Sequence, residues 1–489
     1  MVMKDFFRQP HFKQVFIFGI LVYGVALFAL IRGDVYYIDD WRHSIDGGNW
    51  NHFSRYVATK LSHIVNLKPI AIDVSPLTQI FAVMFLVFGG MIISFLICKK
   101  IDYIGMLAAI PLGLSPYFLE NLSYKFDSVF MGFSVLCCIL PFLLKDRTLI
   151  FFISSVVCLI LMYCSYQASN GIYMILGIYL TLSVYFVEGA SLKRALGFLF
   201  VCILAFLIAS LIYKVFLVKP VETYVSDSMF PLSQLLIGGG ANLKRYLTLV
   251  YQDLSRTPYF YLVLVMMMCF VLHFVHVSIR SKLFAFVSSV LFIVLGLCIS
   301  YGLYLVLQKP LFEPRAFIGI GGFVAVLCVA SIDDTRSSKI FRMLPRILIV
   351  LIAYSLVVFA TAYGNAVTKQ QEYIYFRTDV LVRDLESIIS KDEQSAVEFQ
   401  GNIGYARATK PFVYYYQNIG RRLIPVLMSG NWVFTYQPLL NHRKVPYGGY
   451  GSSECQNKPA QSTLLLSNHY QDIYKAGSCY IINLKDPKP

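Results

Sequence analysis

Long apolar segments recur through most of the 489-residue sequence, and they restrict its fold more than any other feature. A membrane-spanning helix needs about 20 mainly apolar residues, whereas a soluble domain is only about 45–50% apolar overall. Here 57% of the residues are hydrophobic, 16% are aromatic, and the mean hydropathy is +0.64. The sequence therefore predicts a polytopic α-helical membrane protein. We expect eleven spans, at residues 14–31, 78–98, 103–119, 128–144, 148–164, 171–187, 195–217, 259–277, 283–307, 316–331 and 347–364.

Lysine and arginine are unevenly distributed among the loops that these spans would create. Cytoplasmic loops of membrane proteins carry an excess of both residues. If the N-terminus, with Lys4, Arg8 and Lys13, is cytoplasmic, every short loop on that side is basic. These loops contain Lys99, Lys100, Lys145, Arg147, Lys193, Arg194, Arg280, Lys282, Arg336, Lys339, Arg342 and Arg346. We therefore attribute much of the net charge of +15 to topology rather than to nucleic-acid binding, and we predict a periplasmic C-terminus.

The sequence divides into a membrane domain, which begins with the first span, and a polar tail. The first apolar run lacks a small-residue cleavage site, so we expect a retained span rather than a signal peptide. The membrane domain should cover residues 1–364, and a small α/β domain should follow at 365–489. In that tail we expect a helix near 367–391 and strands at 395–399 and 479–484.

Two of the eleven cysteines, Cys455 and Cys479, lie in this polar tail, and nine lie in or beside apolar runs. A disulfide between the two is one interpretation if the tail is outside the cytoplasm. The stretch from Leu236 to Ala241 is apolar and glycine-rich. It is either a piece that dips back into the membrane or a flexible turn, and we expect the turn.

Two adjacent carboxylates, Asp39 and Asp40, come directly after the first predicted span, beside Trp41 and Arg42. Charge next to a bilayer is costly unless it is solvated or paired. One interpretation is that the pair only solvates a helix end. The other is that it abstracts a proton, holds a metal ion or pairs with cations.

A periplasmic enzyme has no ready supply of nucleotide sugars, and a sugar carried on a polyprenyl phosphate lipid would meet that need. Transfer from such a donor needs a carboxylate to deprotonate the acceptor and a cation to neutralise the departing phosphate. Asp39 and Asp40 are the candidate catalytic bases, and Arg42 and Arg315 are the candidate phosphate ligands. Arg315 directly precedes a predicted span, where it is otherwise explained as a snorkelling arginine.

Two motifs resemble those of the phage- and bacterium-encoded serotype-converting glucosyltransferases, which are lipid-dependent membrane glycosyltransferases of the GT-C class. The first is Asp39-Asp40-Trp41-Arg42, followed by Gly47-Gly48-Asn49-Trp50 and Arg55. The second is Ser115-Pro116-Tyr117-Phe118-Leu119-Glu120-Asn121-Leu122-Ser123-Tyr124-Lys125-Phe126-Asp127-Ser128. We expect residues 115–127 of this motif to form a short external loop between two spans.

The resemblance implies transfer of glucose from undecaprenyl-phosphate glucose to the O-antigen of lipopolysaccharide, on the periplasmic face of the bacterial inner membrane. It also implies that an acidic residue of the first external loop acts as the catalytic base. Glu120 and Asp127 would bind the acceptor or a divalent cation such as Mg²⁺, whose requirement stays open. The full set of predicted substrate-binding residues is Trp41, Arg55, Glu120, Asn121, Tyr124 and Asp127. Expected partners are the donor lipid, lipopolysaccharide, a donor flippase and a donor-synthesising glycosyltransferase.

Two other functions fit a chain with many spans and an external tail. One is an O-antigen polymerase or ligase. The other is a transporter or flippase of lipid-linked sugars, which should place ionisable residues inside its spans. The ionisable residues here gather in the predicted external loops instead, and we see no internal repeat of the kind that many transporters contain.

Overall fold

The computed structural model describes residues 2–219, 226–332, 339–389, 396–430, 432–440, 455 and 462–487. The chain forms two compact units. The first, which we call the helical unit, comprises Met1–Phe28 and Asn49–Thr361. The second, the C-terminal unit, comprises Ala362–Pro489 and, unexpectedly, Ala29–Gly48. The division near Thr361 lies close to the predicted boundary at 364/365, but the segment that carries the acidic pair belongs with the tail.

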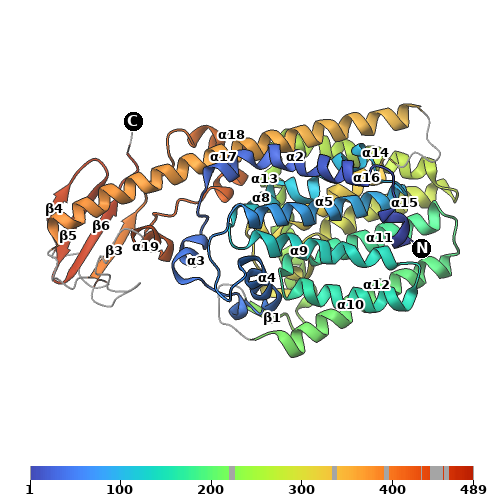
Figure 1. Ribbon diagram of the computed structural model, residues 1–489, viewed down its shortest axis with the longest axis horizontal. Helices are drawn as coiled ribbons and strands as arrows, with labels where there is room; N and C mark the ends of the chain where they lie inside the picture. The colour runs from blue at the N-terminus through green and yellow to red at the C-terminus, as the bar shows by residue number, and fades with distance from the viewer. Residues whose placement is uncertain are drawn as a thin grey trace. The chain divides into compact units, whose positions relative to one another are not determined.

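The helical unit consists of helices joined by short connections (Figure 1). Its helices, including two that continue into the C-terminal unit, are α1 (Val2–Phe7), α2 (Phe12–Gly33), α4 (Tyr56–Asn66), α5 (Leu77–Cys98), α6 (Tyr103–Ala109), α7 (Pro111–Leu114), α8 (Pro116–Ser123), α9 (Ser128–Ile139), α10 (Thr148–Tyr163), α11 (Asn170–Phe186), α12 (Leu192–Ile212), α13 (Leu235–Leu254), α14 (Pro258–Val277), α15 (Lys282–Ile299), α16 (Gly319–Ala330) and α17 (Lys339–Ile388). A small antiparallel pair, β1 (Ser226–Met229) and β2 (Leu307–Lys309), completes it.

Seven helices among the described residues are long and apolar enough to cross a membrane, and a bent pair makes up to eight. Three shorter apolar helices, at Ser128–Leu144, Thr148–Tyr163 and Gly319–Ala330, coincide with predicted spans. The chain is therefore a multi-pass helical membrane protein, as predicted. The count of eleven spans and the GT-C fold stay predictions.

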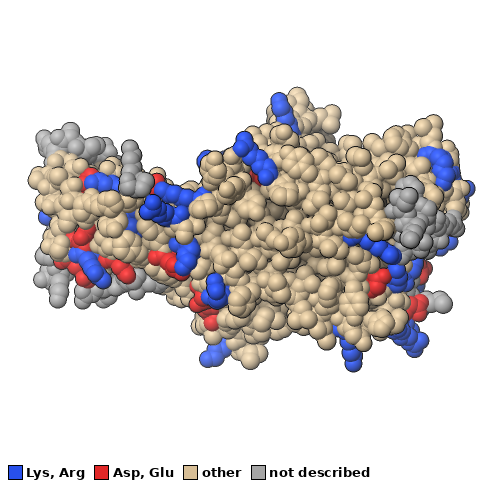
Figure 2. All heavy atoms as spheres, turned by 90° about the horizontal axis from the view of Figure 1, so that it is seen from above, with Lys and Arg blue, Asp and Glu red and all other residues tan. Residues whose placement is uncertain are grey.

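Burial explains why the short apolar helix α16 still belongs in the bundle. Every one of its residues is buried, and it packs on α7 and α11. In contrast α12 exposes Phe200, Leu207 and Leu211, which are 58–63% accessible and suited to lipid contact. Figure 2 shows a broad area without charged side chains over the bundle. Exposed apolar side chains within such an uncharged area indicate contact with a membrane.

The predicted span at 103–119 is broken into two helical pieces that together are apolar enough to cross a membrane. The pair Tyr103–Leu114 and Pro116–Ser123 is bent by 65° at Ser115. Ser115 accepts a hydrogen bond from the N–H of Phe118, and Pro116 occupies the first turn, which together start a new helix. The expected external loop at 115–127 is therefore largely helix α8, and all eight residues of that helix are buried.

The glycine-rich stretch at 236–241 is not a turn, because it lies inside the 20-residue helix α13. Glycine weakens an isolated helix by about 1 kcal/mol per residue relative to alanine. Tertiary contacts offset this cost here, since Asn242 Nδ2 donates to the carbonyls of Leu305 and Leu307 at 3.0 and 2.8 Å. The predicted span at 283–307 likewise ends earlier, with α15 at Ile299, before the chain enters β2.

The C-terminal unit is built on a four-stranded sheet of order β3-β6-β5-β4 (Figure 1). Its strands are β3 (Ala396–Gly401), β4 (Thr463–Ser467), β5 (Gln471–Ala476) and β6 (Cys479–Leu484), and its helices are α3 (Asp40–Asp46), α18 (Lys410–Leu423) and α19 (Val433–Leu440). Only β3 and β6 are parallel. Leu381 and Leu385 of α17 pack with the sheet to form one core. The two predicted strands are confirmed, but the predicted helix at 367–391 is the end of α17 rather than a separate element.

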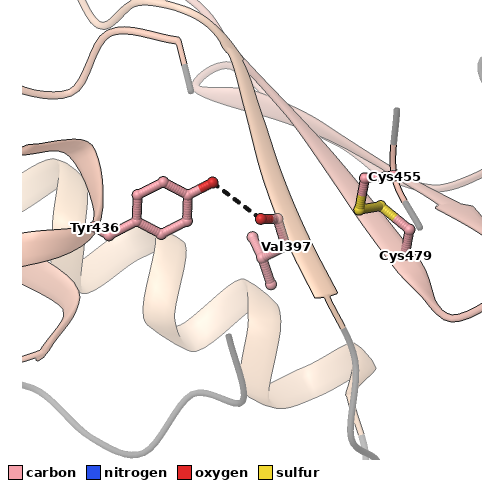
Figure 3. The surroundings of a disulfide bond; sticks show 4 residues. All are labelled: Val397, Tyr436, Cys455 and Cys479. Carbon is pink, nitrogen blue, oxygen red and sulfur yellow. Dashed lines mark hydrogen bonds between the residues drawn. A yellow bond between two sulfur atoms is a disulfide. The ribbon is translucent and has the colours of Figure 1, made fainter. Parts of the chain in front are cut away.

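Cys455 and Cys479 form a disulfide at the start of β6, as one interpretation of the sequence anticipated (Figure 3). Nearby, the Tyr436 hydroxyl of α19 donates to the Val397 carbonyl of β3 at 3.0 Å. The other nine cysteines are free thiols. Disulfides form and persist mainly in oxidising compartments.

Candidate active site

The two adjacent carboxylates have different surroundings within the C-terminal unit. Asp40 begins α3 and is fully buried. Its Oδ2 accepts a 2.9 Å hydrogen bond from the N–H of Tyr37, which closes the turn before the helix. Asp39 is half-buried, and its carboxylate makes no hydrogen bond with the residues that the structure describes. Asp40 therefore fixes the local backbone, whereas Asp39 is open to a substrate.

Trp41 lies in the core of the C-terminal unit rather than on a surface. Its side chain is fully buried in the cluster that contains Leu381 and Phe399, and its ring centroid lies 5.6 Å from that of Tyr375. A sugar cannot stack on a ring covered in this way, so the predicted substrate contact by Trp41 is corrected. Trp41 instead anchors the acidic segment to the core.

Arg42 forms an exposed ion pair on α3. Its Nε lies 3.3 Å from Asp46 Oδ2, one helical turn along, and the two side chains are 73% and 57% accessible. Such exposed pairs stabilise proteins by only about 0–1 kcal/mol. The predicted role of Arg42 in phosphate binding stays a prediction, with part of its charge already compensated.

Within the helical unit, Glu120 and Arg315 form a buried ion pair. Glu120 lies on α8, and Arg315 lies in the short 3₁₀ helix Pro314–Ala316. The carboxylate accepts from Arg315 Nη1 at 2.8 Å and from the Arg315 backbone N–H at 2.6 Å. The side chains are only 2% and 15% accessible. Charge-assisted bonds to both carboxylate oxygens hold the connection before α16 rigidly against α8.

Tyr166 contacts both Arg55 and Arg315 and so connects Arg55 to this ion pair. The Tyr166 hydroxyl donates to the Arg315 carbonyl at 2.9 Å, and the Arg55 guanidinium lies 4.9 Å from the Tyr166 ring centroid. Arg55 Nε also donates to Gln167 Oε1 at 3.1 Å. Among the described residues its partners are all neutral, so the positive charge of Arg55 is not compensated by a carboxylate.

Asn121 and Tyr124 follow Glu120 and are almost completely buried. The guanidinium of Arg315 lies 6.0 Å from the Tyr124 ring centroid. Neither amide atom of Asn121 has a hydrogen-bond partner among the described residues. A buried amide without partners is costly in a folded protein, and such groups are explained by a ligand or water that joins them.

Asp127 accepts a 3.0 Å hydrogen bond from the indole N–H of Trp50, and it is 6% accessible. This bond ties the start of α9 to the connection before α4. Next to it, the Lys125 ammonium lies 3.1 Å from Asp73 Oδ2, and the Lys125 side chain is only 3% accessible. The hydrogen bond from Trp50 gives Asp127 a structural role. Its predicted role in binding the acceptor or a metal ion stays a prediction.

The structure thus brings Glu120, Tyr124 and Arg315 together, with Arg55 linked through Tyr166, and it ties Asp127 to Trp50. Sequence reasoning did not assign site roles to Trp50, Asp73, Lys125, Tyr166 or Gln167. Trp50 and Lys125 lie inside the two sequence motifs, so the motifs themselves were a signal for them. Asp73, Tyr166 and Gln167 lie in other loops, and nothing local in the sequence shows which residues they contact.

Metal binding also stays open. In the described part of the chain, the one group of three potential ligand atoms that lie close together comprises Glu398, Cys455 and Cys479. The two cysteines are joined in the disulfide and are therefore not thiolate ligands.

Fold and site together define a multi-pass helical membrane protein with buried ion pairs around a broken helix. A family model described as glucosyl transferase GtrII matches residues 27–326, which include every predicted site residue. The chain belongs to this family and is a glycosyltransferase, so the predicted family is confirmed. It is also 21% identical to an uncharacterized 55.3 kDa protein in the gtrB 5' region of Salmonella phage P22, over 95% of this chain and 98% of the relative. No solved structure matches the chain.

Proposed function

We propose that the protein transfers glucose from undecaprenyl-phosphate glucose to the O-antigen of lipopolysaccharide, at the periplasmic face of the bacterial inner membrane. The observation that carries this proposal is the family match over residues 27–326. The basic short loops support a cytoplasmic N-terminus. The disulfide supports a tail outside the cytoplasm, where lipopolysaccharide precursors and the donor headgroup would be available.

Asp39 is the proposed general base. It takes the proton of the acceptor hydroxyl, whose oxygen then attacks the anomeric carbon of glucose. The bond between that carbon and the phosphate oxygen breaks, and its electron pair leaves with undecaprenyl phosphate, so the configuration inverts. Two observations favour Asp39 over its neighbour: Asp39 is half-buried with an unbonded carboxylate, whereas Asp40 is buried and bonded to the N–H of Tyr37.

Arg55 is the proposed cation for the departing phosphate. Arg315 and Arg42 were predicted for this role, but each already lies against a carboxylate, Glu120 or Asp46. A guanidinium with neutral partners keeps more of its charge for an anion that develops during the reaction. In this proposal Arg315 positions the residues around α8.

The function is tested by nuclear magnetic resonance of O-polysaccharide from host cells with and without the gene. With the gene, we expect glucose side groups to be added to polysaccharide chains of unchanged length. We expect no added glucose when the gene carries Asp39→Asn. Short chains on deletion would instead identify a polymerase or ligase. Translocation of the lipid in vesicles without any sugar transfer would identify a flippase.

A further inference from the structure

A polar pocket of about 370 Å³ lies within the C-terminal unit, where α2 ends beside α17. Arg32 and Gly33 line it from α2, and Asn365, Thr368, Gln371 and Tyr375 are among the residues that line it from α17. A Cβ atom on Gly33 would overlap the Thr368 hydroxyl, so glycine allows the two helices to approach this closely. The volume is at the lower end of the range for small-molecule pockets, about 300–1,000 Å³, with room for roughly one or two sugar rings.

Gln371 is the residue in this pocket that points to a ligand. It is only 4% accessible, and its Nε2 has no hydrogen-bond partner among the described residues. The neighbouring Gln370 is different, because its amide bonds the Gly404 carbonyl and the Ala406 N–H. A buried amide that lines a cavity and makes no bond of its own is placed to bond a molecule in that cavity.

The charges around the pocket favour a neutral ligand over a phosphate. Lys369 donates to Glu372 at 2.7 Å, so these two opposite charges compensate each other. The guanidinium of Arg32 donates to Asn365 Oδ1 at 3.3 Å. The carbonyl end of α2 adds partial negative charge at the same place. A single arginine beside a helix C-terminus is a weak anion site.

The same lining matches the chemistry of a saccharide. Amide, hydroxyl and carboxylate groups offer both donors and acceptors for sugar hydroxyls. Tyr375 is 37% accessible and supplies an aromatic ring for the apolar face of a sugar. The ring of Tyr375 also contacts Trp41, which directly follows the acidic pair. The pocket is thus connected by packing to the segment that carries the proposed base.

We propose that this pocket binds a sugar unit of the polysaccharide acceptor, with Gln371 as its principal hydrogen-bonding residue. The inference rests on the proposed function, since it names the residues that would recognise the acceptor. Gln371 is a binding residue in this account, and the donor lipid binds elsewhere.

The test compares Gln371→Leu and Glu372→Gln with a control, Arg383→Gln, in full-length protein in nanodiscs. Arg383 is exposed on the same helix and does not line the pocket. Leucine keeps the size of glutamine and removes an unpartnered buried amide, so it should not lower the melting temperature. We expect Gln371→Leu to raise the KM for acceptor about tenfold, the change that corresponds to one lost hydrogen bond. We expect a smaller rise for Glu372→Gln, with kcat and the donor KM unchanged and the control like wild type.

A separate binding measurement distinguishes failure of this inference from failure of the proposed function. O-polysaccharide fragments released by mild acid serve as the probe in saturation-transfer nuclear magnetic resonance. Wild type should bind them, and Gln371→Leu should bind them about tenfold more weakly. If wild type transfers glucose while the variants keep its acceptor KM, the inference alone is overturned. A raised donor KM would also overturn it and place the donor phosphate in the pocket. If wild type binds the fragments but transfers no glucose, the proposed function fails and the pocket stands.

Discussion

Buried charges around one helix of the helical unit and two polar side chains of the C-terminal unit differ in their partners. Around α8 in the helical unit, the buried charges of Glu120 and Lys125 each lie within 3.1 Å of an opposite charge. Along α17 and α3 in the C-terminal unit, Gln371 and Asp39 make no hydrogen bond with the described residues. The difference suggests a division of roles. Paired charges hold the helices in place, and groups without partners are left for substrates.

The largest expected effect comes from splitting the buried pair. Arg315→Met leaves the carboxylate of Glu120 buried without its counter-ion, and we expect a loss of about 3–5 kcal/mol in stability. The double variant Glu120→Gln/Arg315→Met should lose less, because no charge stays buried. Thermal unfolding in detergent measures both.

An exposed pair in the other unit provides the matched control. Arg42→Met breaks the pair with Asp46, whose side chains are 73% and 57% accessible, and it should cost about 0–1 kcal/mol. Equal losses of stability for Arg315→Met and Arg42→Met would show that burial does not set the energetic contribution of these two ion pairs.

Removing the disulfide should affect the C-terminal unit alone. The bridge joins residues separated by 24 positions, and loop closure of this length corresponds to about 2–4 kcal/mol. Hydrogen exchange in Cys455→Ala/Cys479→Ala should become faster across β3, β5 and β6 and stay unchanged in α5 and α9. Faster exchange throughout both units would show that their stabilities are not separate.

Asn121→Leu tests whether an unpartnered amide in the helical unit resembles Gln371. The variant removes two buried polar atoms that have no partner among the described residues, so stability should stay within about 1 kcal/mol of wild type. Glucosyl transfer should nevertheless fall about tenfold if Asn121 contacts substrate. Unchanged transfer would assign Asn121 to packing.

The smallest effect is a pH dependence in the sheet. Hydrogen bonds from Lys485 and Ser467 lower the pKa of Asp472 below its usual value of 3.8. The folded state therefore gains stability at pH values above the usual pKa of 3.8, and this gain is lost as the pH falls through the lowered pKa. We expect roughly 0.2–1 kcal/mol, because the pair is in contact with solvent. Asp472→Asn should remove this part of the pH dependence, and parallel curves for both proteins below pH 4 would contradict the assignment.

Sequence patterns predicted those parts of the fold that depend on local composition. The apolar run at 78–98 is helix α5 (Leu77–Cys98), and the predicted strand at 479–484 is β6. The motif at 115–128 was recognised, but its structure was not. Ser115, Glu120 and Asn121 are typical of a polar loop. Nothing near them in the sequence shows that Glu120 pairs with a residue 195 positions away.

Long-range packing also explains the other differences. The acidic segment joins the tail because Trp41 enters a core formed by residues more than 300 positions later, such as Ile374 and Phe399. The glycines of α13 are held helical by contacts to the chain around residue 306. The types of residue at the candidate site were visible in the sequence, whereas their pairing was not.

The central claim is that Asp39 is the base for glucosyl transfer. The measurement is the rate of transfer from labelled undecaprenyl-phosphate glucose by purified wild type, Asp39→Asn, Asp40→Asn and, as a control, Asp46→Asn from the same segment. We expect Asp39→Asn to lower the rate by roughly 10²–10⁴ without lowering the melting temperature, and Asp46→Asn to resemble wild type. An Asp39→Asn variant that keeps the wild-type rate would contradict the account, and a selective loss in Asp40→Asn would move the base to that residue.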